Sequence, residues 1–248
     1  MKLILLGTGG YYATAERQTA CLMLPEMGIV LDAGSGICRL AEYRRTPQLE
    51  IFLTHAHLDH VLGLTFLLNV APAEVIRETT VHGEADKLAA VRDHLFNPAI
   101  FPVEPQFQFA PLDASPQLVL AGGGTLTHFP LTHPGGSIGF RLDWPGHSMA
   151  YVTDTTAAAN ASYLDAIRGV DLLVHECYFA DNDRDLPAIT GHSWLQPVAE
   201  LAAAANVGRL VLLHIGPHYK NCGAFDLAPA RRIFNDVEIG FDRMELDF

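Results

Sequence analysis

Short apolar runs alternate with segments of helical periodicity along most of the chain. The runs are continuous and bounded by turn residues, which predicts strands buried on both faces. Predicted strands in the two outer thirds span residues 3–6, 29–31, 51–53, 171–175, 209–214 and 237–241. The middle third is richer in strands, with turn breaks such as Trp144-Pro145-Gly146. Its predicted strands span residues 107–109, 117–121, 125–131, 137–142 and 148–153.

Helical periodicity fills most of the remaining chain. The predicted helices span residues 61–70, 83–96, 161–167, 193–205 and 227–234. The second of these ends at Asn97-Pro98, where proline forbids continuation. Ser193 is suited to cap the fourth, and Pro197 is tolerated there because it lies in the first turn. This order predicts an α/β protein in which two sheets are flanked by helices. No polar Pro/Gly/Ser linker divides it, so we expect one domain over residues 1–248.

Composition narrows the class of protein. The chain has 248 residues, of which 49% are hydrophobic and 18% charged, as is usual for soluble globular proteins. The apolar run at residues 3–6 is shorter than the roughly 7–15 residues of a secretory signal. No run approaches the roughly 20 residues of a membrane span. We therefore expect a cytoplasmic protein with no membrane partner.

Charge and cysteine content exclude further classes. The formal net charge of −12 would repel a polyanion, whereas nucleic-acid-binding proteins usually present a basic surface. The four cysteines form no C-x-x-C pair and are widely separated, which predicts free thiols and no disulfide framework or zinc knuckle. They are Cys21, Cys38, Cys177 and Cys222.

The candidate chemistry is concentrated between the predicted strand 51–53 and the predicted helix 61–70. Four metal-competent side chains fall within six residues there: His55, His57, Asp59 and His60. A strand-to-helix turn places side chains at the carboxyl end of a sheet, where α/β proteins build their sites. We expect the first two side chains on one side of the turn and the other two on the opposite side. This predicts two adjacent divalent metal ions, zinc from the ligand types, with manganese or iron as alternatives.

The run His55-Ala56-His57-Leu58-Asp59-His60 resembles the H-x-H-x-D-H signature of metallo-β-lactamase-fold hydrolases. Further segments resemble, in the same order, the motifs of the ribonuclease Z-like branch, so that the resemblance covers almost the whole chain. These segments are residues 6–10 with 16–18, 31–36, 131–133 with 139–142, 151–155, 175–176, 191–193 and 212–215. The resemblance implies an αββα sandwich of two mixed β-sheets flanked by helices.

The resemblance also implies a ligand set. The first metal ion would be held by His55, His57 and His133, the second by Asp59, His60 and His214, and both by a bridging Asp154. Taken alone, the downstream residues keep other readings. His133 could be a loop histidine, Asp154 a turn former and His214 a core histidine.

The resemblance further implies a hydrolytic mechanism. Two cations roughly 3.5–4 Å apart can bridge a water and lower its pKa toward neutrality. The metal-bridged hydroxide would then attack phosphorus or a carbonyl carbon, with Asp59 orienting it and acting as base. His192, in a Gly-His-Ser loop, matches the histidine that the ribonuclease Z-like branch places against the phosphate, and it would assist departure of the leaving oxygen. Glu176 could orient His192 or be only a strand-end carboxylate.

Substrate size is the remaining question at this level. Ribonuclease Z carries a flexible arm between the third metal motif and the bridging aspartate, which it uses to grip transfer RNA. In this chain His133 and Asp154 are only 21 positions apart. We therefore expect a small or cyclic phosphodiester as the substrate and transfer RNA as an unlikely partner. The resemblance leaves a homodimer open.

Other activities are compatible with the same metal platform. The main alternative is a thioesterase or lactonase, since the fold alone does not determine the reaction. A redox diiron protein fits less well, because that branch usually has a carboxylate at the position of His57. A scaffold in which metal ions only hold the fold together disagrees with the intact ligand set.

Overall fold

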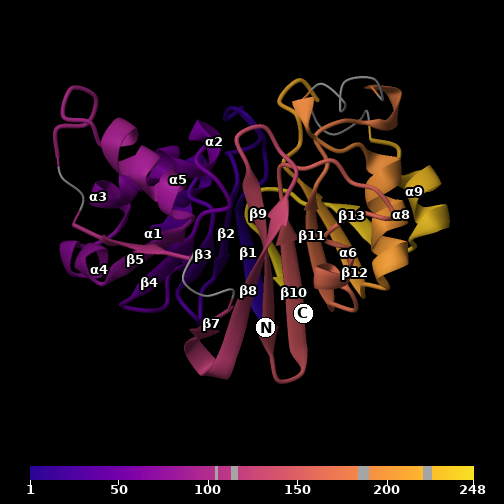
Figure 1. Ribbon diagram of the computed structural model, residues 1–248, viewed down its shortest axis with the longest axis horizontal. Coiled ribbons are helices and arrows are strands. Elements are labelled where there is room, and N and C mark those ends of the chain that lie inside the picture. The colour runs from indigo at the N-terminus through magenta and orange to yellow at the C-terminus, as the bar shows by residue number, and fades with distance from the viewer. Residues whose placement is uncertain (104–105, 113–116, 184–189, 220–224) are drawn as a thin grey trace.

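In the computed structural model, the strands of the described residues form two sheets that pack face to face (Figure 1). The structure describes residues 1–103, 106–112, 117–183, 190–219 and 225–248. Both chain termini lie at the same end of the sandwich (Figure 1), where the backbone N–H of Phe248 donates to the carbonyl of Met1 (3.0 Å).

The first sheet has seven strands within the described residues, in the order β14-β1-β2-β3-β4-β5-β6. Strands β14 to β3 pair antiparallel and strands β3 to β6 pair parallel. Their bounds are β1 Lys2–Gly7, β2 Cys21–Leu24, β3 Ile29–Leu31, β4 Leu49–Phe52, β5 Thr79–Gly83, β6 Gln108–Pro111 and β14 Met244–Asp247.

The second sheet repeats this mixed pattern. In the part of the chain that the structure describes it also has seven strands, in the order β13-β12-β11-β10-β9-β8-β7. Strands β13 to β10 are parallel and β10 to β7 antiparallel. Their bounds are β7 Gln117–Leu120, β8 Gly124–Leu131, β9 Ser137–Trp144, β10 His147–Val152, β11 Leu172–Glu176, β12 Arg209–Leu213 and β13 Val237–Ile239.

Helices cover the outer face of each sheet (Figure 1). Those beside the first sheet are η1 Ser35–Arg39, α1 Leu40–Tyr43, α2 Leu58–Val61, η2 Leu62–Phe66, α3 Leu67–Val70, α4 Ala73–Arg77, α5 Ala85–Ala90 and the π-helical η3 Val91–Leu95. Those beside the second sheet are α6 Leu164–Ile167, α8 Leu195–Ala205 and α9 Leu227–Ile233. Two further short 3₁₀ turns lie among the described residues, η4 Ala121–Gly123 and η5 Asp181–Asp183.

The core has three layers, as an αββα sandwich requires. Alternate residues of each strand face opposite sides. Leu3 and Leu5 of β1 therefore lie between the two sheets, while Ile4 and Leu6 lie under the first helical layer. A third cluster joins α8 to the outer face of the second sheet. The predicted αββα sandwich of two mixed sheets is confirmed. The division into one domain stays a prediction, which the shared interior of the two sheets supports.

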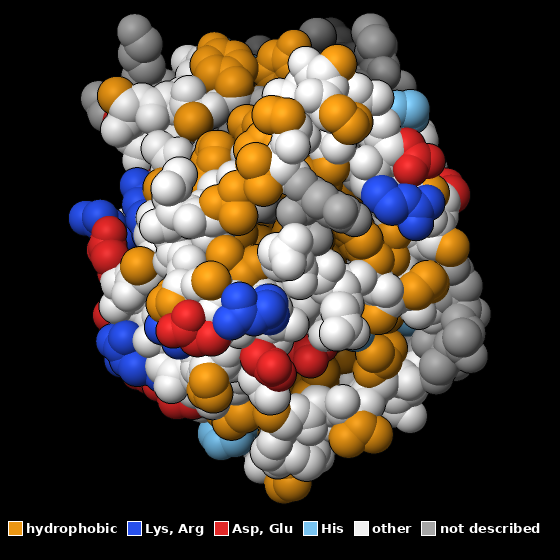
Figure 2. Space-filling view, turned by 90° about the vertical axis from the view of Figure 1, so that its left-hand side faces the viewer, with side chains coloured by type: hydrophobic (Ala, Val, Ile, Leu, Met, Phe, Trp, Pro, Cys, Tyr) orange, Lys and Arg blue, Asp and Glu red, His pale blue; other side chains and the backbone are white. Residues whose placement is uncertain are grey.

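The first helical layer is seen from outside in Figure 2, where apolar side chains gather in a band across it. Exposed members of this layer include Leu62 of η2 and Leu68 of α3. The sequence predicted one helix over residues 61–70, but the chain forms three short helices from residue 58 to residue 70. Gly63 lies against the backbone, since a Cβ there would stand 2.2 Å from the carbonyl oxygen of Gly34. This close contact fits a chain that bends around the core.

Two predictions from composition can be compared with the coordinates. Among the described residues, no helix is both long and apolar enough to cross a membrane. Cys21, Cys38 and Cys177 are free thiols, the first and third buried and the second exposed. Cys222 lies outside the described residues.

Candidate metal centre

The centre lies where parallel strands of both sheets end at one edge of the sandwich. Residues 54–60 follow β4, and Asp154 follows β10 by two residues. His133 follows β8, and His214 directly follows β12. Open α/β sheets place their binding sites at the carboxyl ends of strands for the same geometric reason. The two sheets therefore contribute ligand candidates to one place.

Glycines allow the turn after β4 to approach the chain after β3. A Cβ on Gly34 would stand 2.2 Å from the carbonyl oxygen of Asp59. The backbone N–H of Ala33 donates to the carbonyl of His60 (2.8 Å). Helix α2 then begins at Leu58, with His57 in extended conformation as its N-cap. This local packing fixes the direction of the side chains in the turn.

The first group of ligand candidates combines three histidines with one carboxylate. The ring nitrogens of His55, His57 and His133 and a carboxylate oxygen of Asp154 lie within 4.8 Å of one another. His55 Nε2 is 3.6 Å and His133 Nε2 is 3.5 Å from Asp154 Oδ2. Nδ1 of His57 lies 3.3 Å from His133 Nε2. The structure thus brings together the four residues expected around the first ion.

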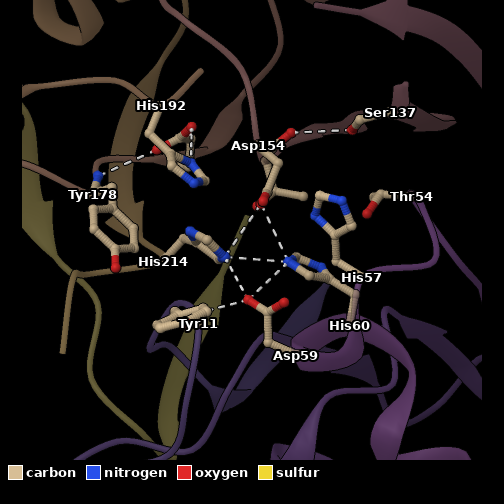
Figure 3. Close-up of polar contacts among 12 residues, drawn as sticks. Tyr11, Thr54, His57, Asp59, His60, Ser137, Asp154, Tyr178, His192 and His214 are labelled. Atoms are coloured by element: carbon tan, nitrogen blue, oxygen red, sulfur yellow. Dashed lines mark hydrogen bonds and ion pairs between the residues drawn. The ribbon is translucent and has the colours of Figure 1, made fainter. Parts of the chain in front are cut away.

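The second group lies on the other oxygen of the same carboxylate (Figure 3). Asp154 Oδ1 is 3.2 Å from Nε2 of both His60 and His214. Asp59 Oδ2 is 3.2 Å from His214 Nε2 and 3.5 Å from His60 Nε2. Asp154 therefore offers one oxygen to each group, as a bridging ligand would. Metal ligation by these seven residues stays a prediction.

The donor set fits divalent cations. The two Nε2 atoms of His60 and His214 face each other at 3.2 Å, an arrangement that needs a proton or a cation between them. The buried Nε2 of His55 finds no hydrogen-bond partner among the described residues, although buried polar atoms rarely lack one. Imidazole and carboxylate are the ligands of catalytic zinc and related ions.

Asp32 supports the second group from behind. This carboxylate is fully buried, and its Oδ2 accepts hydrogen bonds from the Tyr151 hydroxyl and His60 Nδ1, both at 2.8 Å. Its Oδ1 accepts the backbone N–H of Thr54 at 2.8 Å. When His60 donates through Nδ1, its Nε2 carries the lone pair that a cation needs. The structure thus places Asp32 directly against a candidate ligand.

The two groups differ in their electrostatics. Burial lowers the pKa of His60, but Asp154, Asp32 and Asp59 outweigh it and hold the pKa well above its usual range. For His55, burial and the neighbouring His60 hold the pKa well below its usual range. Burial raises the pKa of Asp59, but His60 and His214 outweigh it and the net shift is downward. Asp59 is therefore a carboxylate at neutral pH.

His192 stands beside both groups and is held by Glu176. His192 Nδ1 lies 3.1 Å from Glu176 Oε1, and the Tyr178 ring stacks on the imidazole at a centroid distance of 4.7 Å. A ring nitrogen of His192 lies within 4.8 Å of ligand atoms of Asp154 and His214. Burial lowers the pKa of His192, but the Glu176 carboxylate outweighs it, so the net shift is upward. Of the two readings for Glu176, contact with His192 is the one observed.

Ser193 does not cap the following helix, and that prediction was wrong. Helix α8 begins at Leu195, and its N-cap, Trp194, makes no side-chain cap. The Ser193 hydroxyl instead donates to the carbonyl of Thr155 (2.7 Å) and accepts the backbone N–H of Ala157 (2.9 Å). It therefore ties the loop of His192 to the loop of Asp154.

The sequence did not single out two tyrosines of the site (Figure 3). The backbone N–H of Tyr11 donates to Asp59 Oδ2 (2.8 Å), and its ring is exposed. Tyr178 lines, with Tyr11, an open pocket of about 240 Å³ above His57, Asp154 and His192. Gly10, which precedes Tyr11, was part of a quoted motif, and a Cβ there would stand 2.7 Å from the His214 ring. The position of Tyr11 directly after this motif is the sequence signal that could have pointed to it.

Comparison with known proteins gives consistent matches. Residues 28–215 match the sequence profile of the Beta-lactamase superfamily domain. A ribonuclease Z from Bradyrhizobium diazoefficiens is 29% identical over 303 aligned positions, which cover 97% of each chain. The metallo-beta-lactamase fold protein YhfI from Bacillus subtilis superposes with a TM-score of 0.79 at 20% identity, covering 99% of both chains. The short form of human tRNase Z superposes with a TM-score of 0.77 at 22% identity, covering 100% of this chain and 99% of that one.

The prediction that transfer RNA is an unlikely partner was wrong. Relatives named ribonuclease Z align with this chain from end to end. The alignment spans 303 positions, more than the 248 residues of this chain. The ribonuclease Z therefore contains segments that this chain lacks, yet the two align over nearly their whole lengths. The total charge of −12 was a poor guide, because it averages over the molecule and does not describe the surface around one site.

Proposed function

This chain belongs to the β-lactamase superfamily, and we propose that, as a metal-dependent hydrolase of this fold, it is a ribonuclease Z-like phosphodiesterase. One observation carries the proposal. Two groups of metal-competent side chains share the carboxylate of Asp154, and a histidine paired with a glutamate stands beside both. The ribonuclease Z relative matched over nearly its full length supports the same reaction class.

We assign the ligands as the sequence predicts. His55, His57 and His133 would hold one divalent ion, Asp59, His60 and His214 the other, and Asp154 both. Zinc is the proposed metal, with manganese or iron as alternatives, because the set combines imidazole with carboxylate. When bound, two such ions supply Lewis acidity toward a phosphoryl oxygen and lower the pKa of water.

Asp59 is proposed as the residue that orients the attacking water and accepts its proton. Its carboxylate is kept ionised by His60 and His214, and Tyr11 fixes Oδ2 through a backbone N–H. An oriented carboxylate near the reacting atoms is what general-base assistance requires.

His192 is proposed as the residue that protonates the leaving oxygen. The Glu176 carboxylate favours the imidazolium form, since it raises the pKa of His192. Glu176 is itself held by the backbone N–H groups of Thr155 and Ser193. Tyr178 stacks on the ring and fixes its plane. An imidazolium at this place favours a phosphodiester over a thioester or lactone, because the phosphoryl group carries a negative charge that a neutral carboxyl ester lacks.

The substrate range is tested by comparing five reactions. We expect metal-dependent cleavage of bis-p-nitrophenyl phosphate and of a small cyclic phosphodiester, which suits the short β9–β10 hairpin. A transfer RNA with a 3′ extension is assayed beside them because of the ribonuclease Z relatives. Thioester and lactone substrates should react at least tenfold more slowly. Faster carboxyl-ester than phosphodiester cleavage, abolished by a chelator, would reverse the assignment.

A further inference from the structure

A second cavity lies beside the metal centre and contains none of its candidate ligands. Its volume is about 320 Å³, within the range of small-molecule sites. Three aromatic side chains line it: Tyr12, Tyr219 and Phe241. The pocket directly over the centre has a smaller volume, about 240 Å³.

The same two chain segments line both hollows, and we call these segments the wall. Tyr11 lines the pocket at the centre, and Tyr12, the next residue, lines the second cavity. In the facing segment after β12, His214 lines the first and Ile215 the second. The two chain segments are joined, because the backbone N–H of Gly10 donates to the carbonyl of Ile215 (3.1 Å). A group attached to a phosphate at the centre is thus within short reach of the second cavity.

Hydrogen bonds hold the chain around the second cavity. The Thr14 hydroxyl accepts the backbone N–H groups of Glu16 and Arg17 at 3.2 and 3.1 Å. The Arg17 guanidinium donates to the carbonyl of Gly240 (2.7 Å). On the opposite side, the Tyr219 hydroxyl accepts the backbone N–H of Ala180 (3.1 Å). These bonds hold the side chains of Thr14, Arg17 and Tyr219 in place.

The lining suits a planar ring with a polar edge. Tyr12 is 54% and Phe241 58% exposed, so their rings are available for stacking, as in the aromatic platforms that bind bases. Glu16 and Arg17 bring a carboxylate and a guanidinium to the same lining. A carboxylate accepts the ring N–H groups of a nucleobase, which a hydrocarbon ring would lack.

We propose that this cavity is a nucleobase subsite, which binds the nucleoside carried by one ester arm of the phosphodiester. The proposal rests on the phosphodiesterase function above. Stacking on Tyr12 and Phe241 supplies the affinity, and Glu16 at the rim selects a base with an N–H donor.

Two esters with the same leaving group test the subsite. Thymidine 5′-p-nitrophenyl phosphate carries a base on its second arm, and methyl p-nitrophenyl phosphate carries none. We expect kcat/KM for the thymidine ester to exceed that for the methyl ester at least tenfold. Tyr12→Ala and Phe241→Ala should reduce this ratio to near one. Glu16→Ala should reduce it about threefold, in line with one lost hydrogen bond.

Ile100→Ala is the matched control, because Ile100 is an exposed apolar residue (72%) outside the cavity. It should leave the ratio unchanged. A ratio that survives Tyr12→Ala and Phe241→Ala would overturn the subsite while leaving the phosphodiesterase function intact.

Binding of free thymidine separates the two proposals, because thymidine has no phosphate to contact metal ions. Ligand-observed NMR should detect binding of thymidine to the unaltered protein and no binding to the Tyr12→Ala variant. If neither ester is cleaved but thymidine still binds in this way, the function fails and the subsite stands. If thymidine does not bind the unaltered protein, the subsite is wrong.

Discussion

Two histidines, one from each half of the metal centre, are held very differently. His60 of the second group is fully buried, and Asp32 fixes its ring from behind. His57 of the first group is exposed and lines the open pocket. The difference lies between individual residues: His60 is held by the core, whereas His57 faces the pocket, as do Asp59 and His214 of the second group.

Charge also differs between the two halves. The second half concentrates carboxylates, and these keep the pKa of His60 well above its usual range despite burial. In the first half, burial lowers the pKa of His55 and His133. Neutral imidazoles bind a cation without first releasing a proton. His55 and His133 would therefore coordinate an ion without losing a proton, whereas His60 would release one.

The largest effect should come from the carboxylate that both halves share. Asp154→Asn removes the charge from both groups at once, so we expect loss of both ions and a fall in kcat/KM of about 10³-fold, equivalent to about 4 kcal/mol of barrier. Mass spectrometric metal analysis and phosphodiester turnover measure the two effects. His57→Ala, which alters one half, should retain more metal than Asp154→Asn. Equal losses from both variants would contradict the division into halves.

His192→Ala should have the next largest effect, and only on turnover. Removing a general acid lowers rates by about 10²–10⁴-fold, so we expect at least a 10²-fold decrease in kcat with unchanged metal content. His147→Ala, at the start of β10 and far along the strand from the centre, is the matched control. Unchanged turnover in His192→Ala would eliminate the assignment.

Asp32→Asn should weaken the second half. Loss of the partner of a metal-ligating histidine costs about 10–100-fold in metal affinity. An amide also cannot accept all the buried donors that Asp32 now satisfies, so we expect the free energy of unfolding to fall by about 3 kcal/mol. Chelator competition and urea denaturation measure these quantities. Unaltered metal affinity would show that the second half does not depend on Asp32.

Tyr151→Phe should have the smallest effect. It removes one hydrogen bond to Asp32 Oδ2 but leaves those from Thr54 and His60. We expect a loss of about 1 kcal/mol in the free energy of unfolding and no change in metal content. A large metal loss here would mean that the support of His60 is more fragile than its other contacts suggest.

The sequence predicted most of the strands that the structure describes. Residues 29–31 were predicted as a strand and form β3. Strand β2 was missed, although its four residues form a continuous apolar run followed by Pro25 and Gly28, the kind of pattern that predicted residues 3–6. Strand β14 was also missed, since only its pairing with β1 makes its alternation meaningful. An edge position alone does not explain a missed strand, because the predicted strands 107–109, 117–121 and 237–241 correspond to the edge strands β6, β7 and β13.

The seven ligand candidates followed from motifs, but their supports did not. Asp32 meets Tyr151 across the two sheets, 119 positions apart in sequence, and no local pattern specifies that register. Three site residues, Asp32, Asp154 and His214, also adopt positive φ of 58°, 51° and 56°. Residues other than glycine rarely adopt this backbone conformation without tertiary constraint, so helix and strand propensities could not have indicated it.

The centre takes ligands from both sheets, and this has a consequence for biosynthesis. His214 lies 159 positions after His55, and it reaches the cluster only when β12 has added to β11. A growing polypeptide therefore exposes its first histidines long before the last one leaves the ribosome. Binding of the two proposed ions would therefore be a late event in maturation, and the bound ions would join the two sheets of the sandwich.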